Sequence, residues 1–68
     1  MINIILNNRQ ESIDVDSMTV QELLNHKNFT FKLLVVKING KLIKRDSYDE
    51  AVIRDGDEVT VLHLVSGG

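Results

Sequence analysis

The chain lacks cysteine, proline and tryptophan, and its aromatic residues are limited to two Phe and one Tyr. Without cysteine, neither a disulfide nor a thiolate metal site can hold so small a domain together, so its stability must come from an apolar core. The absence of cysteine fits a reducing compartment and excludes a side-chain persulfide. The scarcity of aromatic residues and the net charge of −2 argue against a nucleic-acid partner, which requires a basic face and stacking rings.

Long apolar runs are also missing. The longest is Leu33–Val36, which is far too short to cross a bilayer. The first residues, Met1–Ile4, show neither the basic start nor the small-residue cleavage site of a signal peptide. We therefore expect a soluble cytoplasmic protein with no membrane partner. Its 68 residues, 43% of them hydrophobic, suffice for one small domain.

The N-terminal segment predicts a β-hairpin. Ile2, Ile4 and Leu6 alternate with Met1, Asn3 and Ile5, which is the period of a strand with one face in the core. Asn7 and Asn8 follow, and asparagine tolerates the positive φ of a tight turn. Alternation resumes over Ser12–Val15 and predicts the second strand.

A helix is predicted over Val20–His26. Thr19 and Glu22 have the spacing of a capping box, in which each residue satisfies the other's backbone amide. Met18 and Leu23 occupy the two positions of a hydrophobic staple. Because so short a helix does not persist in isolation, it must pack on a sheet.

A second hairpin is predicted in the middle of the chain. Leu33–Ile38 is the most apolar segment and predicts a central strand, buried on both faces for much of its length. Asn39 and Gly40 form the strongest short hairpin signal, because both residues adopt positive φ readily. Lys41–Lys44 then predicts a charged edge strand.

The C-terminal third predicts one more strand. Residues 45–53 read as irregular, with one helical turn near Tyr48–Glu50. Asp55–Asp57 predicts a tight turn into a final strand over Glu58–Val65. If the first and last strands lie side by side in parallel, the helix crosses one face of the sheet. The fold class is then α+β, a mixed sheet of four to five strands with one helix across it, as in the β-grasp fold.

The sequence ends in Gly67-Gly68. Two residues without a Cβ allow the backbone to enter a channel too narrow for side chains. We expect residues 1–64 to form the domain and Val65, Ser66, Gly67 and Gly68 to form a flexible tail, which spans at most about 14 Å. The carboxylate of Gly68 would need activation before reaction. No phosphate-binding glycine loop is present, so ATP is expected on a partner and no cofactor on this chain.

Three stretches resemble the ThiS-type sulfur carriers of thiamine biosynthesis: Val36–Asn39 with Ile43–Arg45, then Arg54–Val59, and finally His63–Gly68. The resemblance covers the whole chain and implies a ubiquitin-like β-grasp fold. It also implies that the chain is a co-substrate rather than an enzyme. An E1-like adenylating enzyme would activate Gly68, and a sulfur donor such as a cysteine desulfurase system would convert it to a thiocarboxylate. Thiazole synthase would then accept the sulfur.

Three other functions share this fold. The small subunit of molybdopterin synthase uses the same thiocarboxylate chemistry, but members of that family tend to be longer, with aromatic residues and proline before the tail. A ubiquitin-like modifier would form isopeptide bonds through Gly68. A β-grasp interaction module would need no tail chemistry. The lack of proline and of aromatic residues near the C-terminus favours the thiamine pathway.

The last strand also predicts a docking face. Val59 and Val61 point to one side of the strand, whereas Leu62 and Leu64 point to the other. If the valines face the helix, Leu62 and Leu64 are exposed beside the tail and form a partner-binding site. Alternatively, the two leucines pack under residues 45–53. The sequence does not distinguish these arrangements.

The remaining polar residues predict no catalytic site. His63 is expected near the end of the sheet and His26 at the helix end, where a partly charged imidazole favours the helix dipole. Nothing joins them to carboxylates at metal-ligand spacing. Lys41, Lys44 and Arg45 read as edge charges that discourage sheet aggregation, or as a contact for an acidic partner.

Overall fold

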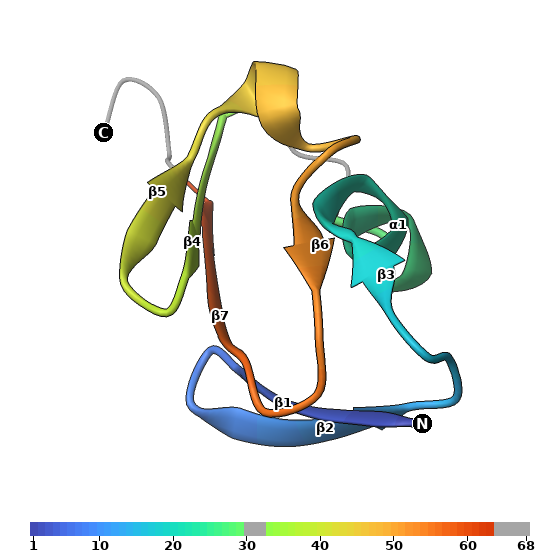
Figure 1. Cartoon of the computed structure of the whole chain (residues 1–68). Coiled ribbons are helices and arrows are strands. Elements are labelled where there is room, and N and C mark those ends of the chain that lie inside the picture. The colour runs from blue at the N-terminus through green and yellow to red at the C-terminus, as the bar shows by residue number, and fades with distance from the viewer. Residues whose placement is uncertain (30–32, 64–68) are drawn as a thin grey trace.

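A five-stranded mixed sheet forms the body of the protein in a computed structural model, which describes residues 1–29 and 33–63 (Figure 1). The strand order is β2-β1-β7-β4-β5. β1 and β7 are parallel, and the other neighbouring pairs are antiparallel. The strands are β1 (Ile2–Leu6), β2 (Arg9–Ile13), β4 (Leu34–Ile38), β5 (Lys41–Ile43) and β7 (Glu58–His63). The predicted mixed sheet, with its first and last strands adjacent, is confirmed.

Both predicted asparagine turns are present. Asn7 and Asn8 have φ values of 51° and 67°, and Asn39 and Gly40 have values of 53° and 81°. These left-handed pairs match the twist of the strands that they join, so each turn closes a tight hairpin. The second strand begins at Arg9 and ends at Ile13, and therefore lies earlier than the predicted Ser12–Val15.

Helix α1 (Val20–His26) covers one face of the sheet and has the predicted bounds. Its capping box is complete, because Thr19 Oγ1 accepts from Glu22 N at 3.1 Å and Glu22 Oε1 accepts from Thr19 N at 2.9 Å. The side chains of Val20, Leu23 and Leu24 are buried against the sheet. Local capping and an apolar stripe therefore determine where this helix begins and which side it buries.

A second, two-stranded sheet was not predicted. It pairs β3 (Met18–Thr19) with β6 (Val52–Ile53) in antiparallel register. A 3₁₀ helix, η1 (Arg45–Ser47), precedes β6, so the helical turn predicted near Tyr48–Glu50 begins earlier. Such short strands leave no period in the sequence and form only because tertiary packing places them together.

The core lies between the large sheet and the layer made by α1, β3 and β6 (Figure 1). Tyr48, at the end of η1, is also buried there. The buried residues are Ile2, Ile4, Leu6, Ile13, Met18, Val20, Leu23, Leu24, Val36, Tyr48, Ile53, Val59 and Val61.

The prediction that β4 is buried on both faces is wrong. Val36 is fully buried, but Lys37 is exposed and Val35 only half-buried. The reason is that a single helix covers a single face of the sheet. Within residues 1–29 and 33–63, no helix or strand packs on the opposite face, which we call the open face.

Candidate functional site

The described part of the candidate site is strand β7 and its surroundings. Leu64 and the tail residues Val65, Ser66, Gly67 and Gly68 lie outside the described residues. His63 is the last described residue, and its Cα partner is Leu34 on β4. The site is therefore built from the strand that leads towards the terminal glycines.

The two faces of β7 have different environments. Val59 and Val61 point into the core, with 0% and 7% of their surface exposed, whereas Leu62 has 48% exposed. This alternation is the two-residue period of a strand with one covered face. Of the two arrangements considered for Leu62, packing beneath residues 45–53 does not occur. Its role in partner binding stays a prediction.

Leu62 does not stand alone on the open face. Its Cα partner on β4 is Val35, which is half-buried. On the other side of β4, Leu42 of β5 pairs with Lys37 and has 57% of its surface exposed. Leu62, Val35 and Leu42 thus share one face across three adjacent strands, and we call them the open-face patch.

Sequence reasoning missed Val35 and Leu42 as candidate site residues. The available signal was the Asn39-Gly40 turn, because a two-residue hairpin loop fixes the register of its strands and places Leu42 opposite Lys37. Lys37 also pairs with Thr60 of β7. One lysine therefore stands between the apolar side chains of the patch and adds a positive charge to it.

The start of β7 is held by hydrogen bonds between two turns. Asp57 Oδ2 accepts from Arg54 N at 2.9 Å, and Asp57 Oδ1 accepts from Asn39 Nδ2 at 3.1 Å. Asn39 Oδ1 in turn accepts from Glu58 N at 2.9 Å. Gly56 lies between the aspartates with φ of 88°, a conformation that favours glycine. These contacts anchor the strand at the end opposite to the tail.

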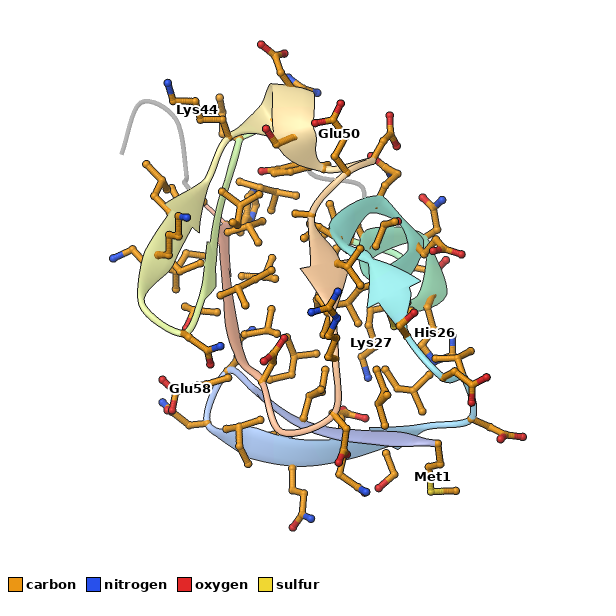
Figure 2. All side chains as sticks on the ribbon, viewed as in Figure 1. Met1, His26, Lys27, Lys44, Glu50 and Glu58 are labelled. Atoms are coloured by element: carbon orange, nitrogen blue, oxygen red, sulfur yellow. The ribbon has the colours of Figure 1, made fainter. Side chains whose placement is uncertain are left out.

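A polar hollow lies beside the β1–β2 hairpin, on the side of the helix. Lys27, the C-cap residue of α1, points towards the hairpin (Figure 2) and its Nζ lies 2.9 Å from Glu11 Oε1. Both side chains are about one-third exposed, with 30% and 33% of their surfaces accessible. The hollow is lined by Leu6, Asn7, Arg9, Glu11, Lys27 and Phe29. It was not predicted as a site.

The described residues contain no cluster of three or more His, Asp or Glu side chains that could hold a metal ion. His26 is the last residue of α1, and His63 is on β7 with an exposed side chain. The single α-helix among the described residues is far too short to traverse a bilayer.

Comparison with known proteins gives consistent results. The model of the ThiS family matches residues 3–68. The sulfur carrier protein ThiS of Bacillus subtilis strain 168 is 30% identical over 63 residues, which cover 93% of this chain and 96% of that protein. The crystal structure of the thiamine biosynthesis protein ThiS from Geobacter metallireducens superposes with a TM-score of 0.88 at 29% identity, covering 98% of this chain and 100% of the other. A solution structure of the thiamine biosynthesis protein from the same organism gives a TM-score of 0.81.

Proposed function

The chain belongs to the ThiS family, and we propose that it carries sulfur for thiamine biosynthesis as a thiocarboxylate on Gly68. The observation that supports this most directly is the family match, which extends from residue 3 to residue 68 and so includes Gly67 and Gly68. The relative from Bacillus subtilis is a sulfur carrier protein. The relatives from Geobacter are thiamine biosynthesis proteins, which favours the thiamine pathway over molybdopterin.

The chemistry follows from the unreactive nature of a carboxylate. A Gly68 carboxylate oxygen attacks the α-phosphorus of ATP, so an acyl adenylate forms and pyrophosphate leaves. The terminal sulfur of the donor's cysteine persulfide then attacks the acyl carbon, and AMP departs with the bonding electron pair. A thiol of the donor system cleaves the S–S bond of the resulting acyl disulfide by forming a disulfide with the donor cysteine, and the thiocarboxylate is released. The product carries sulfur in place of one carboxylate oxygen. In this proposal the chain is the co-substrate, and the partner enzymes bind ATP and catalyse both steps.

The partners in this proposal are an E1-like adenylating enzyme, a sulfur donor such as a cysteine desulfurase system, and thiazole synthase. Gly68 is the fifth residue after His63, so the tip lies at most about 17 Å beyond the last described residue. Gly67 and Gly68 have no side chains, which suits a narrow catalytic channel. The chain itself needs no cofactor, and the proposed compartment is the cytoplasm.

We propose that the partners dock on the open face, next to the tail. Leu62 is exposed there, opposite Val35 and on the same face as Leu42, and Leu64 lies two residues further along the sequence. Docking on this face offsets the entropy lost when the tail is ordered in a channel, roughly 1–2 kcal/mol per residue. Leu62 and Leu64 are thus proposed as partner-binding residues and Gly68 as the reacting residue.

Intact-mass measurement tests this function. The purified chain is incubated with the adenylating enzyme, ATP and a sulfur donor, and the expected change is the replacement of one oxygen by sulfur at Gly68, located by fragmentation. Omitting ATP should abolish it. The Gly68→Ala variant should fold normally and react poorly, because a channel shaped for glycine excludes the added methyl group.

Three results would contradict the proposal. One is an unchanged mass when the same enzymes convert an authentic carrier. Another is sulfur transfer to a molybdopterin precursor but not to thiazole synthase, which would assign the chain to the other pathway. Lysine conjugates joined to Gly68 in cell extract would instead identify a protein modifier.

A further inference from the structure

The parallel pairing between β1 and β7 ends before β7 does. The paired residues are Ile5 with Glu58 and Leu6 with Val59. After Leu6 the chain turns away through Asn7 and Asn8 into β2, whereas β7 continues as far as His63. The second half of β7 therefore has β4 on one side but no strand backbone of β1 on the other.

Asn7 replaces part of the missing strand. Its backbone N donates to Val59 O at 3.0 Å, as in a continuing parallel ladder. In such a ladder the carbonyl oxygen of Asn7 would also accept a hydrogen bond from the amide of Val61, two residues beyond Val59 on β7. Here the backbone of Asn7 is left-handed, with φ of 51°, and its side-chain Oδ1 accepts from Val61 N at 2.8 Å. The amide side chain thus takes the place of a main-chain acceptor in a partly buried position.

Asn39 makes an equivalent contact at the other end of β7. It also opens a hairpin turn, with φ of 53°, and its N donates to Glu58 O at 2.7 Å. Its Oδ1 accepts from Glu58 N, the first residue of the strand. Two asparagines from the turns that follow β1 and β4 therefore hold β7, Asn39 at its start and Asn7 in its second half. Of these two asparagines, Asn7 is the one that bonds within two residues of His63, the described residue nearest to Gly68.

We propose that Asn7 is a positioning residue for the reaction at Gly68. It fixes the second half of β7 on the side of β1, so that a partner docked on the open-face patch meets the chain at His63 in one position. This inference rests on the proposed function. Small displacements of a reacting group cost large factors in rate, so loss of the Val61 contact lowers the rate at which Gly68 is adenylated. The affinity of docking, which depends on the patch, changes little.

A pair of glycine substitutions in one turn separates this role from a change in the turn itself. Asn7→Gly keeps the left-handed backbone accessible and removes the acceptor for Val61 N. Asn8→Gly makes the same change at the next residue, where φ is 67° and the structure shows no side-chain hydrogen bond among the described residues. Asn7→Asp retains an acceptor oxygen of the same reach and should restore the wild-type behaviour.

Two measurements are required. Amide hydrogen exchange at Val61 should be at least about tenfold faster in Asn7→Gly than in Asn8→Gly, because the hydrogen bond that protects it is gone. Pyrophosphate release by the adenylating enzyme should show kcat reduced roughly tenfold in Asn7→Gly, with KM for the chain within about twofold of wild type. Asn39→Gly, which loosens the start of β7, should leave kcat unchanged at a temperature where it is folded.

Equal kcat values for Asn7→Gly and Asn8→Gly, with faster exchange at Val61, would reduce Asn7 to a purely structural role and overturn the proposal. If Asn7→Gly does not fold, a synthetic chain with an ester in place of the Val61 amide removes the donor and leaves the turn intact. That chain must show the same loss in kcat. If the unaltered chain is not adenylated, the proposed function fails and this inference fails with it. If it is adenylated and the variants match it, only the positioning role is refuted.

Discussion

The two faces of β7 differ in exposure even where neighbouring residues are of the same kind. Val61 and Leu62 are adjacent aliphatic residues, yet 7% of one and 48% of the other is exposed. The difference does not come from their hydrophobicity. It arises because α1 and the β3–β6 pair cover one side of the sheet and no described element covers the other.

On β7, the side chains that stabilise the fold and those available for binding lie on opposite faces of the strand. A domain of this length has few apolar residues, and most of the buried ones lie where the helix packs on one face of the sheet. Aliphatic side chains on the open face therefore add little to stability and remain available to partners. Substitutions on the two faces should accordingly change different measurements.

The largest effect is expected on the covered face. Val61→Asp places an unpaired carboxylate in the core, which costs several kcal/mol and is comparable with the roughly 3–5 kcal/mol that such a small core supplies. The variant should be unfolded by circular dichroism and by proton chemical-shift dispersion. A well-folded Val61→Asp chain would reverse the assignment of the two faces.

The same substitution one residue later should leave the fold intact. Leu62→Asp alters an exposed side chain, so the free energy of unfolding should change by no more than about 0.5 kcal/mol. Its affinity for the adenylating enzyme, measured by calorimetry, should fall roughly tenfold, equivalent to about 1.4 kcal/mol.

Gln10→Asp provides the matched control for Leu62→Asp. Gln10 pairs with Ile5 on the same face but belongs to β2, two strands away from β7. It should bind the enzyme like the wild type. Equal affinity of Leu62→Asp and Gln10→Asp would show that the open-face patch is not the docking surface.

A smaller effect is expected where the covering helix begins. Thr19→Ala removes the cap that accepts from Glu22 N, at a cost of about 1 kcal/mol. For a domain of this size that lowers Tm by roughly 4–8 °C in a calorimetric scan. Glu22→Gln retains an acceptor for Thr19 N and should change Tm less. A Thr19→Ala chain with unchanged Tm would mean that packing, not capping, holds α1 on the sheet.

The smallest effect is expected at the edge of the covered face, where Lys27 meets Glu11. Both side chains are partly exposed, so Glu11→Gln should cost about 0.5 kcal/mol in urea denaturation. The difference should shrink in 1 M salt, where the screening length is only about 3 Å. A larger cost that salt does not reduce would indicate a contribution from packing instead of charge.

Much of the fold could be predicted because its signals are local. The capping residues Thr19 and Glu22 determine the start of α1, and its observed bounds equal the predicted ones. The left-handed preferences of Asn7 and Asn39 placed both hairpin turns. The resemblance to the ThiS family, carried by three stretches that include the turn near Gly56 and the terminal glycines, is confirmed by the family match.

Other features could not be predicted because they depend on contacts between distant parts of the chain. Met18 and Ile53 pair across 35 residues in strands too short to show a period. The high apolar content of Leu33–Ile38 suggested burial on both faces, but burial depends on how many layers the chain can supply. Leu42 entered the candidate site only through its register with Lys37.

From the sequence itself came the main strands, the helix, the turns and the proposal that a glycyl carboxylate reacts, because capping, φ preference and a glycyl carboxylate are properties of residues and their immediate neighbours. The tertiary structure decided which face of β7 is covered and that the Asn7 side chain reaches Val61, 54 residues away. Those outcomes depend on how the helix and the strands meet in space, and a one-dimensional pattern does not contain that information.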